Sequence, residues 1–298
     1  MNKPQFEQWI EKRMVKWAAI FLSRSCPSIR FRIIIALLSV LGGLSSFVPP
    51  KAASATDQLQ STRYNWRFVA RGVEYVEVPF VIAGRPRANL IVARIAPSAV
   101  LFRIYYQIGQ RKTIHDWGVE KPSAVVLVNA NYFTTAGRPI GLVRIGSNIM
   151  NPATNRPDSG QFLVQDEVPE IIPLTTNTQK QKPATKNSIS YSESFEGFPF
   201  LITQGKLSSF AAADPEVRAR RTVIAKDTAG RVVIVVTSPL ELSLQEIANW
   251  LQDSGLEIYT ALNLDGGSSS QIQIAGTDFL QIATPVGRVP VVLAVFAR

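Results

Sequence analysis

The residues best suited to chemistry lie between positions 260 and 274, in the stretch TALNLDGGSSSQIQI. One carboxylate, Asp265, precedes Gly266 and Gly267, and three serines follow, Ser268 to Ser270. Glycines let backbone N–H groups converge on an anion, and serine hydroxyls extend such a nest. The pattern therefore predicts an acid or base beside an anion-binding loop. A plain hairpin turn is an equal alternative, because Asp-Gly and Gly-Gly also tolerate the positive φ of tight turns.

A second polar cluster ends the apolar stretch AVVLVNANYF, residues Ala124–Phe133. Five apolar residues predict a buried strand, and Asn129 and Asn131 follow with alternating spacing. Amide groups donate and accept hydrogen bonds at once, which suits sugar hydroxyls. The alternative is that both asparagines make local turn bonds.

Three arginines, Arg218, Arg220 and Arg221, stand just before the predicted strand Thr222–Lys226. Such a run usually forms a solvated surface. An arginine that points into a cleft is instead the best bidentate ligand for a phosphate.

The composition excludes several other chemistries. His115 and Cys26 are the sole histidine and cysteine, so neither a zinc site nor a thiol nucleophile is expected. We place His115 in a surface loop, since no serine elbow accompanies it. No loop dense in Asp and Glu indicates a hard-cation site. We therefore assign no metal ligands and no cofactor, and leave a metal requirement open, because Asp265, Asn129 and Asn131 could coordinate a hard cation through oxygen.

The net charge of +10 lies mostly in the N-terminal segment. Residues 1–32 carry seven Lys or Arg and two Glu, and Lys51 adds one more positive charge, which leaves +4 for residues 52–298. Nucleic-acid binding is therefore not expected, whereas an anionic substrate fits. Oligomeric state is left open.

The N-terminal segment reads as a targeting signal. An uncharged apolar run, Ile33–Val48, follows Arg30 and Arg32, and Ala53–Ala55 forms an A-x-A cleavage pattern. We expect residues 1–55 to be a secretory signal peptide, with an uncleaved membrane anchor at 33–48 as the alternative. Both interpretations predict an exported protein, periplasmic or extracellular, that touches a membrane only through this segment.

Alternating hydrophobicity predicts an antiparallel strand meander at the start of the body, over Val73–Ala83, Asn89–Ala96 and Val100–Gln107. Two later strands, Thr222–Lys226 and Arg231–Thr237, flank a hairpin turn at residues 227–230.

One helix is clear, at Ser243–Asp253, because Ser243 and Glu246 form a capping box before an amphipathic pattern. The continuous apolar run Val289–Ala297 predicts a central strand, and the polar stretch 175–190 an insertion. We therefore predict an α+β fold dominated by strands, in mixed or antiparallel sheets, with one clear helix before the Asp265 loop.

The length suits one sizeable domain or two small ones, and we divide the chain into three parts. Residues 1–55 form the leader, residues 56–122 an N-terminal β meander that packs on the catalytic part, and residues 123–298 the catalytic domain.

From about Val125 onward the chain resembles the phosphodiester glycosidase family. The resemblance rests on four blocks in order, VNANYF, FPFLITQGKL, RRTVIAKDTAGRVVIVV and SLQEIANWLQDSGLEIYTALNLDGGSSS. The last block contains LNLDGGSSSQ, which resembles the family signature NLDGGGSS. Ser268, Ala225 and Ala130 stand where the family has glycine, so each adds a side chain there. The resemblance implies a pocket that contains Asn129, Arg221, Asp265, Gly266, Gly267 and Ser269.

The resemblance implies an exported hydrolase of a sugar-1-phosphodiester or related glycosidic linkage, acting in envelope or exopolysaccharide metabolism. Arg221 would hold the phosphodiester, Asp265 would act as acid/base or nucleophile, and Asn129 would orient sugar hydroxyls. The remaining substrate contacts would come from Gly266, Gly267, Ser268, Ser269 and Asn131.

Glycosidic hydrolysis usually uses two carboxylates, and only Asp265 is a strong candidate. A phosphate leaving group is acidic, so one carboxylate suffices in this interpretation. Two other functions stay open. The protein would be a non-catalytic envelope protein that binds polysaccharide, or it would transfer glycosyl groups in exopolysaccharide assembly.

Overall fold

The computed structural model describes residues 64–82, 85–154, 156–174, 192–209, 217–237, 239–276, 280–282 and 287–298. The chain divides into two units, Met1–Thr56 and Asp57–Arg298, and only the second contains described residues. The predicted leader and the polar stretch 175–190 lie outside the described residues. Within the described ranges, no helix combines the length and the apolar character needed to cross a bilayer.

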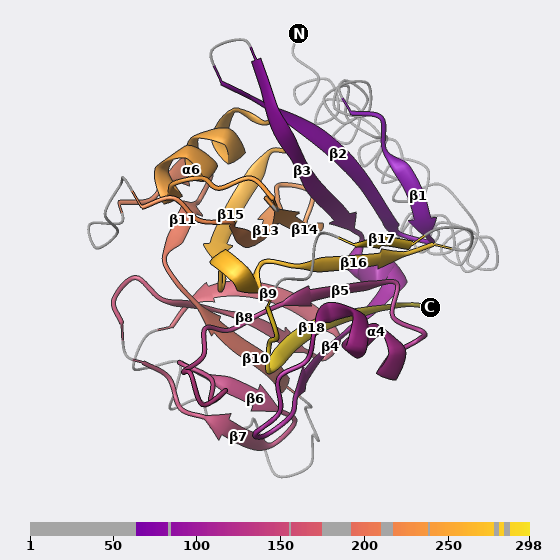
Figure 1. The fold of residues 1–298 in the computed structure, drawn as a ribbon, viewed down its shortest axis with the longest axis vertical. Coiled ribbons are helices and arrows are strands. Elements are labelled where there is room, and N and C mark those ends of the chain that lie inside the picture. Colours follow the sequence, from indigo (N-terminus) through magenta and orange to yellow (C-terminus); the bar gives the residue numbers. More distant parts are fainter. Residues whose placement is uncertain are drawn as a thin grey trace, which may run out of the picture. The chain divides into compact units, whose positions relative to one another are not determined.

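Strands dominate, as predicted, and every recorded strand pair is antiparallel (Figure 1). The largest sheet has eight strands, in the spatial order β1 (Arg67–Ala70), β2 (Val73–Ile82), β3 (Arg85–Ile95), β14 (Val232–Val236), β13 (Thr222–Asp227), β15 (Ile258–Asn263), β11 (Phe200–Thr203) and β12 (Lys206–Leu207).

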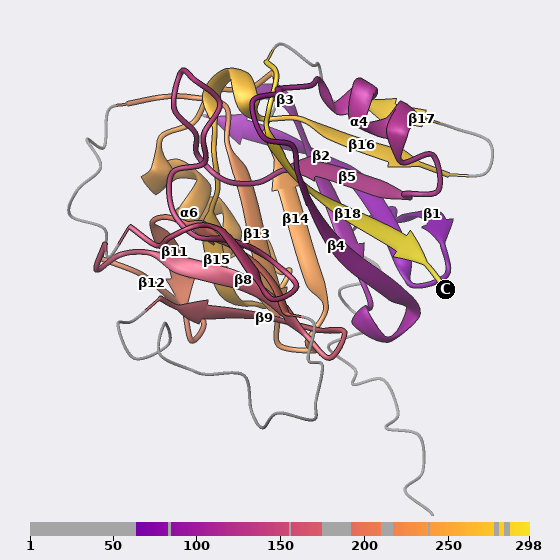
Figure 2. The same ribbon diagram turned by 90° about the horizontal axis from the view of Figure 1, so that it is seen from below.

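Two five-stranded sheets complete the architecture. The first runs β7 (Asn148–Asn151), β6 (Val143–Ile145), β10 (Ser192–Gly197), β8 (Gly160–Gln165) and β9 (Val168–Pro173). The second runs β17 (Leu280–Ile282), β16 (Ile272–Ala275), β5 (Val126–Asn129), β18 (Val291–Ala297) and β4 (Val100–Tyr106). Figure 2 shows β16, β5, β18 and β4 side by side in one layer and β13, β14 and β15 in another.

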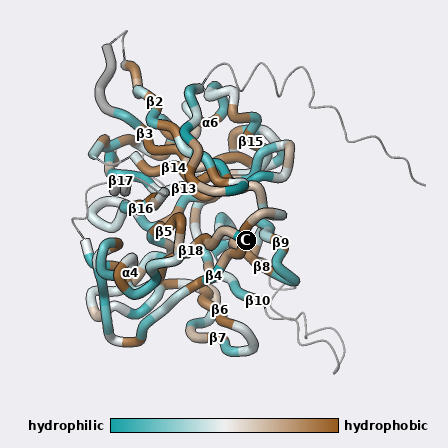
Figure 3. Tube along the Cα trace, turned by 90° about the vertical axis from the view of Figure 1, so that its right-hand side faces the viewer, coloured by the Kyte–Doolittle hydropathy of each residue, from teal (hydrophilic) through white to brown (hydrophobic). Residues whose placement is uncertain are grey.

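The main core contains side chains from all three sheets. Phe102, Phe162 and Phe195 come from β4, β8 and β10, and their rings contact one another at centroid distances of 5.8 and 5.4 Å. Ile234 and Leu262 of the eight-stranded sheet lie in the same cluster and are fully buried. The hydrophobic residues follow these interior strands in Figure 3. Burial of this apolar surface therefore joins the sheets.

The predicted helix is confirmed as α6 (Leu244–Asp253), with Ser243 and Glu246 in a capping box. Its apolar face buries Ile247 and Leu251 in a second cluster, on the other face of the eight-stranded sheet. The turn at 227–230 is confirmed too, because Gly230 adopts φ 81° and strands β13 and β14 pair directly.

Two expectations need correction. His115 lies not in a loop but in a second helix, α4 (Ile114–Glu120), which Thr113 and Asp116 cap reciprocally. The helix packs Trp117 against the second five-stranded sheet. The predicted meander also stops after two strands. A 3-10 turn at Pro97–Ala99 redirects the chain, and β4 then pairs with β18 instead of β3.

Strands β3 and β4, from the N-terminal part of the described chain, are built into the same sheets as later ones. β3 pairs with β14 over five residues, and β4 pairs with β18 over seven. The described body therefore brings early and late strands together around one core.

Candidate active site

The loop after β15, residues 264–271, carries Asp265 and is called the signature loop below. It connects β15 of the eight-stranded sheet to β16 of a different sheet. It is therefore a crossover between sheets and not a hairpin. Gly267 adopts φ 62°, within a short 3-10 turn at Gly267–Ser269. The loop stands where the two sheets meet.

Backbone hydrogen bonds tie this loop to both sheets. The Leu264 N–H donates to the Thr222 carbonyl at 2.9 Å, and the Asp265 N–H donates to the Ala130 carbonyl at 3.1 Å. The Gly267 N–H donates to the carbonyl of Arg220 at 2.8 Å. These bonds fix the position of the Asp265 backbone relative to both sheets.

Asn129 fixes the backbone of the signature loop through hydrogen bonds. It is fully buried, and its Nδ2 donates to the Asp265 carbonyl at 2.8 Å. Its Oδ1 accepts from Thr222 Oγ1 at 2.9 Å and from the Gln271 N–H at 3.1 Å. The Ser270 hydroxyl lies 3.1 Å from that of Thr222, and completes a chain of buried polar groups. The geometry thus assigns Asn129 to positioning the loop, and a contact with sugar hydroxyls has no support in it.

Gln271, which the sequence analysis did not single out, stabilises the C-terminal end of the signature loop. Its Oε1 accepts from the Ile114 N–H at the start of α4, and its Nε2 donates to the Gly287 carbonyl. A Cβ on Gly287 would lie 2.4 Å from the Ser268 carbonyl oxygen, so only glycine permits this close approach.

The predicted anion nest is largely occupied from within the chain. The N–H of Gly266 donates to the Asp265 carboxylate at 2.9 Å, and the N–H of Ser269 to the Gly266 carbonyl at 3.1 Å. With Gly267 bonded to Arg220, Ser268 carries the one loop N–H between 266 and 269 without an acceptor among the described residues. The anion that the loop serves most directly is therefore Asp265 itself.

The Asp265 carboxyl is the unusual acid of the site. Burial raises its pKa from 3.8 to about 6, and hydrogen bonds from the Ser269 hydroxyl and the Gly266 N–H oppose that rise. Burial disfavours the charged form, which accounts for the direction of the shift. A group with a pKa near 6 changes its protonation within the range in which proton transfer is efficient.

Tyr132 connects this acid to the rest of the site. Its hydroxyl donates to the Phe198 carbonyl at 3.0 Å and accepts from Asn263 Nδ2 at 2.6 Å. Its ring stacks on Phe198, with centroids 4.3 Å apart. Burial raises the pKa of Tyr132, and the nearby Asp265 carboxylate raises it further while Arg221 lowers it. Tyr132 therefore lies within the electrostatic reach of both groups and stays neutral.

Arg221 carries a buried charge that has no carboxylate partner among the described residues. The residue is 8% exposed, and its Nε and Nη2 donate to the carbonyls of Leu242 and Val217, each at 2.8 Å. Burial lowers its pKa, and no carboxylate contributes to the shift among the described residues. Buried charges are normally paired, so this guanidinium favours an anion nearby.

A second guanidinium borders the site. Arg156 lies 4.3 Å from the centroid of the Phe198 ring and makes a two-bond ion pair with Asp158. Its loop is held by Glu196, whose carboxylate accepts from the Leu142 N–H at 2.8 Å and the Thr154 N–H at 3.0 Å. Glu196 is fully buried, so it anchors the loop and is shielded from solvent.

The two remaining predicted residues differ in exposure. Asn131 is 2% exposed and donates to the Leu142 carbonyl, so it too supports the surrounding loop. Ser268 is exposed at the turn of the signature loop. Among the described residues, no group of three or more His, Cys, Asp or Glu side chains could hold a metal ion.

The structure brings Asp265, Arg221 and the loop together and adds groups that the sequence analysis missed. Tyr132 and Phe198 are neighbours only in the fold, since 66 positions separate them. The sequence analysis also missed Asn263. Its place inside the signature block, two residues before Asp265, is the local signal that could have identified it. Together these groups place one titratable acid and one buried guanidinium within electrostatic reach of Tyr132.

The family model described as phosphodiester glycosidase matches residues 122–296. The chain therefore belongs to the phosphodiester glycosidase family. No curated protein matches the sequence.

Two solved structures share the fold. The catalytic domain of zebrafish N-acetylglucosamine-1-phosphodiester alpha-N-acetylglucosaminidase, auto-inhibited by its pro-peptide, aligns with a TM-score of 0.57 and 14% identity, covering 76% of this chain and 82% of that one. A hypothetical protein from Synechocystis aligns with a TM-score of 0.55 and 18% identity, covering 76% of this chain. The present chain spans 62% of the Synechocystis protein's length.

Proposed function

We propose that the protein hydrolyses a sugar-1-phosphodiester and releases the sugar and a phosphate monoester. One observation carries the proposal. The Arg221 guanidinium is buried without a carboxylate partner among the described residues, and Tyr132 lies within electrostatic reach of both it and Asp265. A bound phosphodiester would supply the missing negative charge, and the sugar would then lie toward the acid. Family membership supports the same reaction class.

In the proposed step, the ionised Asp265 carboxylate takes a proton from a water molecule. The water oxygen bonds to the anomeric carbon as the bond from that carbon to the phosphate oxygen breaks. The electron pair leaves with the phosphate monoester, whose added negative charge faces Arg221. Guanidinium groups stabilise such developing charge most strongly in a site that excludes water.

The surrounding residues support this step by holding the acid in place. The Gly266 N–H and the Ser269 hydroxyl orient the carboxylate, and Asn129 fixes the loop backbone. The stacked rings of Tyr132 and Phe198 form an apolar wall, which helps to exclude water. Because a phosphate monoester is a good leaving group, the reaction needs no second carboxylate as a general acid.

The setting of the reaction rests on the leader. We propose export to the periplasm or the extracellular space, because residues 1–55 combine a basic region, an apolar run and an A-x-A site. Envelope or exopolysaccharide glycans are the sugar phosphodiesters that an exported enzyme would meet.

The test uses the purified full-length protein with alkyl phosphodiesters of glucose, mannose and N-acetylglucosamine, each joined through the anomeric oxygen. Neutral p-nitrophenyl glycosides of the same sugars serve as the comparison. We expect sugar release from a phosphodiester, its loss in Asp265→Asn, and no change in Asp166→Asn, where an exposed carboxylate is removed.

Release from neutral glycosides alone would contradict the proposed role of Arg221. Binding of glycan without any release would favour the envelope polysaccharide-binding protein. Transfer of the sugar to an added acceptor, in place of water, would favour the glycosyl transfer reaction.

A further inference from the structure

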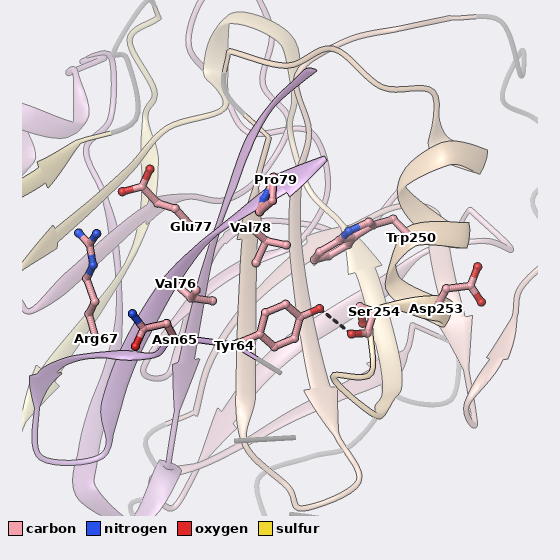
Figure 4. A pocket seen from close by; sticks show the side chains of 10 residues that line it. All are labelled: Tyr64, Asn65, Arg67, Val76, Glu77, Val78, Pro79, Trp250, Asp253 and Ser254. Atoms are coloured by element: carbon pink, nitrogen blue, oxygen red, sulfur yellow. Dashed lines mark hydrogen bonds between the residues drawn. The ribbon is translucent and has the colours of Figure 1, made fainter. Parts of the chain in front are cut away.

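A cavity of about 590 Å³ lies on the eight-stranded sheet, away from the signature loop. Its walls are Tyr64, Asn65 and Arg67, residues 76–79 of β2, and the end of α6 (Figure 4). Ligand sites in proteins span roughly 300–1,000 Å³ and combine apolar walls with a few polar groups. The cavity matches both criteria.

The cavity is separate from the Asp265 site. Helix α6 begins beside Leu242, whose carbonyl holds Arg221, and ends at Asp253 in the cavity wall. Its ten residues span roughly 15 Å. A sugar unit bound in the cavity is therefore not the unit that reacts at Asp265.

Aromatic rings form one wall of the cavity. The indole of Trp250 extends from α6 toward Val78 on β2, and the ring of Tyr64 lines the same space (Figure 4). The Tyr64 hydroxyl donates to the Ser254 carbonyl at 2.5 Å, and its ring contacts Trp66 edge-on. These contacts fix the ring before any ligand arrives, which lowers the entropic cost of binding.

Polar groups complete the lining. Asn65 offers an amide that donates and accepts, and the carboxylates of Glu77, which also accepts from Asn89 Nδ2, and of Asp253 lie in the wall. The single lining cation, Arg67, already donates to the Tyr75 hydroxyl at 3.1 Å. Arg67 also lies within electrostatic reach of Glu77, so the described lining presents no surplus of positive charge. An anionic ligand is therefore disfavoured here, in contrast to the Arg221 site.

We propose that this cavity is an accessory site for neutral sugar units of a glycan. A pyranose ring has an apolar C–H face that packs on an indole or phenol ring, and hydroxyl edges that suit amide and carboxylate groups. The inference goes beyond the proposed reaction and rests on it only for the choice of a glycan ligand. Two sites on one chain would raise the effective concentration of a long substrate at Asp265.

The experiment measures binding directly on the full-length protein carrying Asp265→Asn, so that no substrate turns over. Maltotriose, cellotriose and chitotriose are titrated by isothermal calorimetry and by saturation-transfer NMR. We expect one trisaccharide to bind, and Trp250→Ala to weaken that binding at least about tenfold, which corresponds to loss of one aromatic contact of about 1.4 kcal/mol.

A matched control comes from the same helix. Asn249→Ala removes an exposed side chain next to Trp250 that does not line the cavity, so it should bind like the parent. Asn65→Ala tests the polar side of the cavity without touching α6, and should also weaken binding. Thermal unfolding confirms that each variant is folded.

Two results would overturn the proposal. One is that none of the three trisaccharides binds. The other is that the Trp250 and Asn65 variants bind as tightly as the Asn249 control. Because binding is measured without turnover, a failure of the proposed hydrolysis leaves this test unaffected, and the two failures are distinguishable.

Discussion

Replacing Asp265 by asparagine should remove activity and stabilise the protein at neutral pH. The native pKa of this carboxyl is raised from 3.8 to about 6. The folded protein therefore holds the proton more tightly than the unfolded chain does. The stability contributed by the protonated acid is fully present below pH 3.8 and is lost as the pH rises through about 6.

The size of the effect follows from the shift. Each pKa unit corresponds to about 1.4 kcal/mol, so the ionised carboxylate costs the folded state up to about 3 kcal/mol at pH 8. At pH 4 the shifted pKa of Asp265 lowers the free energy of unfolding by only about 0.5 kcal/mol. Asparagine has the shape of the protonated acid and can still accept from the Gly266 N–H. The variant should therefore gain about 2–3 kcal/mol on the wild type between pH 4 and pH 8.

The assay is urea unfolding followed by circular dichroism at pH 4, 6 and 8. Asp227→Asn is the control, because this buried carboxylate is paired with Arg231 at 2.6 Å, whereas Asp265 is half-buried and has no such pair among the described residues. Loss of that pair should destabilise the protein by about 3 kcal/mol at pH 8. A stability difference between wild type and Asp265→Asn that stays constant from pH 4 to 8 would refute the raised pKa. Asp265 would then no longer qualify as the titratable acid of the site.

Three further substitutions test other parts of the site. Arg221→Lys keeps the charge but loses the planar fork, so kcat/KM for a phosphodiester should fall about tenfold or more, measured by steady-state kinetics; an equal fall for a neutral glycoside would argue against a phosphate contact. Tyr132→Phe removes the hydroxyl that bonds Asn263 and should lower unfolding free energy by about 1–2 kcal/mol, whereas an unchanged thermal midpoint would show that this bond is dispensable. Gly266→Ala places a Cβ 2.6 Å from the Arg220 carbonyl, so it should displace the signature loop and abolish turnover; full activity would show that the loop tolerates the shift.

Elements with strong local signals could be predicted from the sequence. The capping box and the apolar face of α6 both lie within eleven consecutive residues. The composition of the Asp-Thr-Ala-Gly segment at the end of β13 likewise predicts the turn. Helix α4 was missed because it has only seven residues and is capped by Asp116 instead of a glutamate. Short helices owe their stability to packing, which here comes from Trp117 against strands of the second five-stranded sheet.

The signature loop shows what local patterns leave open. Asp265, Gly266 and Gly267 are compatible with a hairpin as well as a crossover, and the choice depends on whether β16 pairs with β15 or with β5. That pairing joins residues more than 100 positions apart, such as Val128 and Ile272. The roles of Asn129 and Arg221 depend on the same long-range contacts. The sequence patterns single out both residues as candidates, while their hydrogen-bond partners can be seen only in the fold.

The central claim is that water attacks the anomeric carbon of a sugar-1-phosphodiester with Asp265 as base. The most direct measurement is turnover of such a diester in ¹⁸O-labelled water, followed by mass spectrometry of both products. The account predicts ¹⁸O in the released sugar, none in the phosphate monoester, and no release by Asp265→Asn. Label in the phosphate would mean that the phosphorus–oxygen bond breaks instead, and would contradict the proposed mechanism.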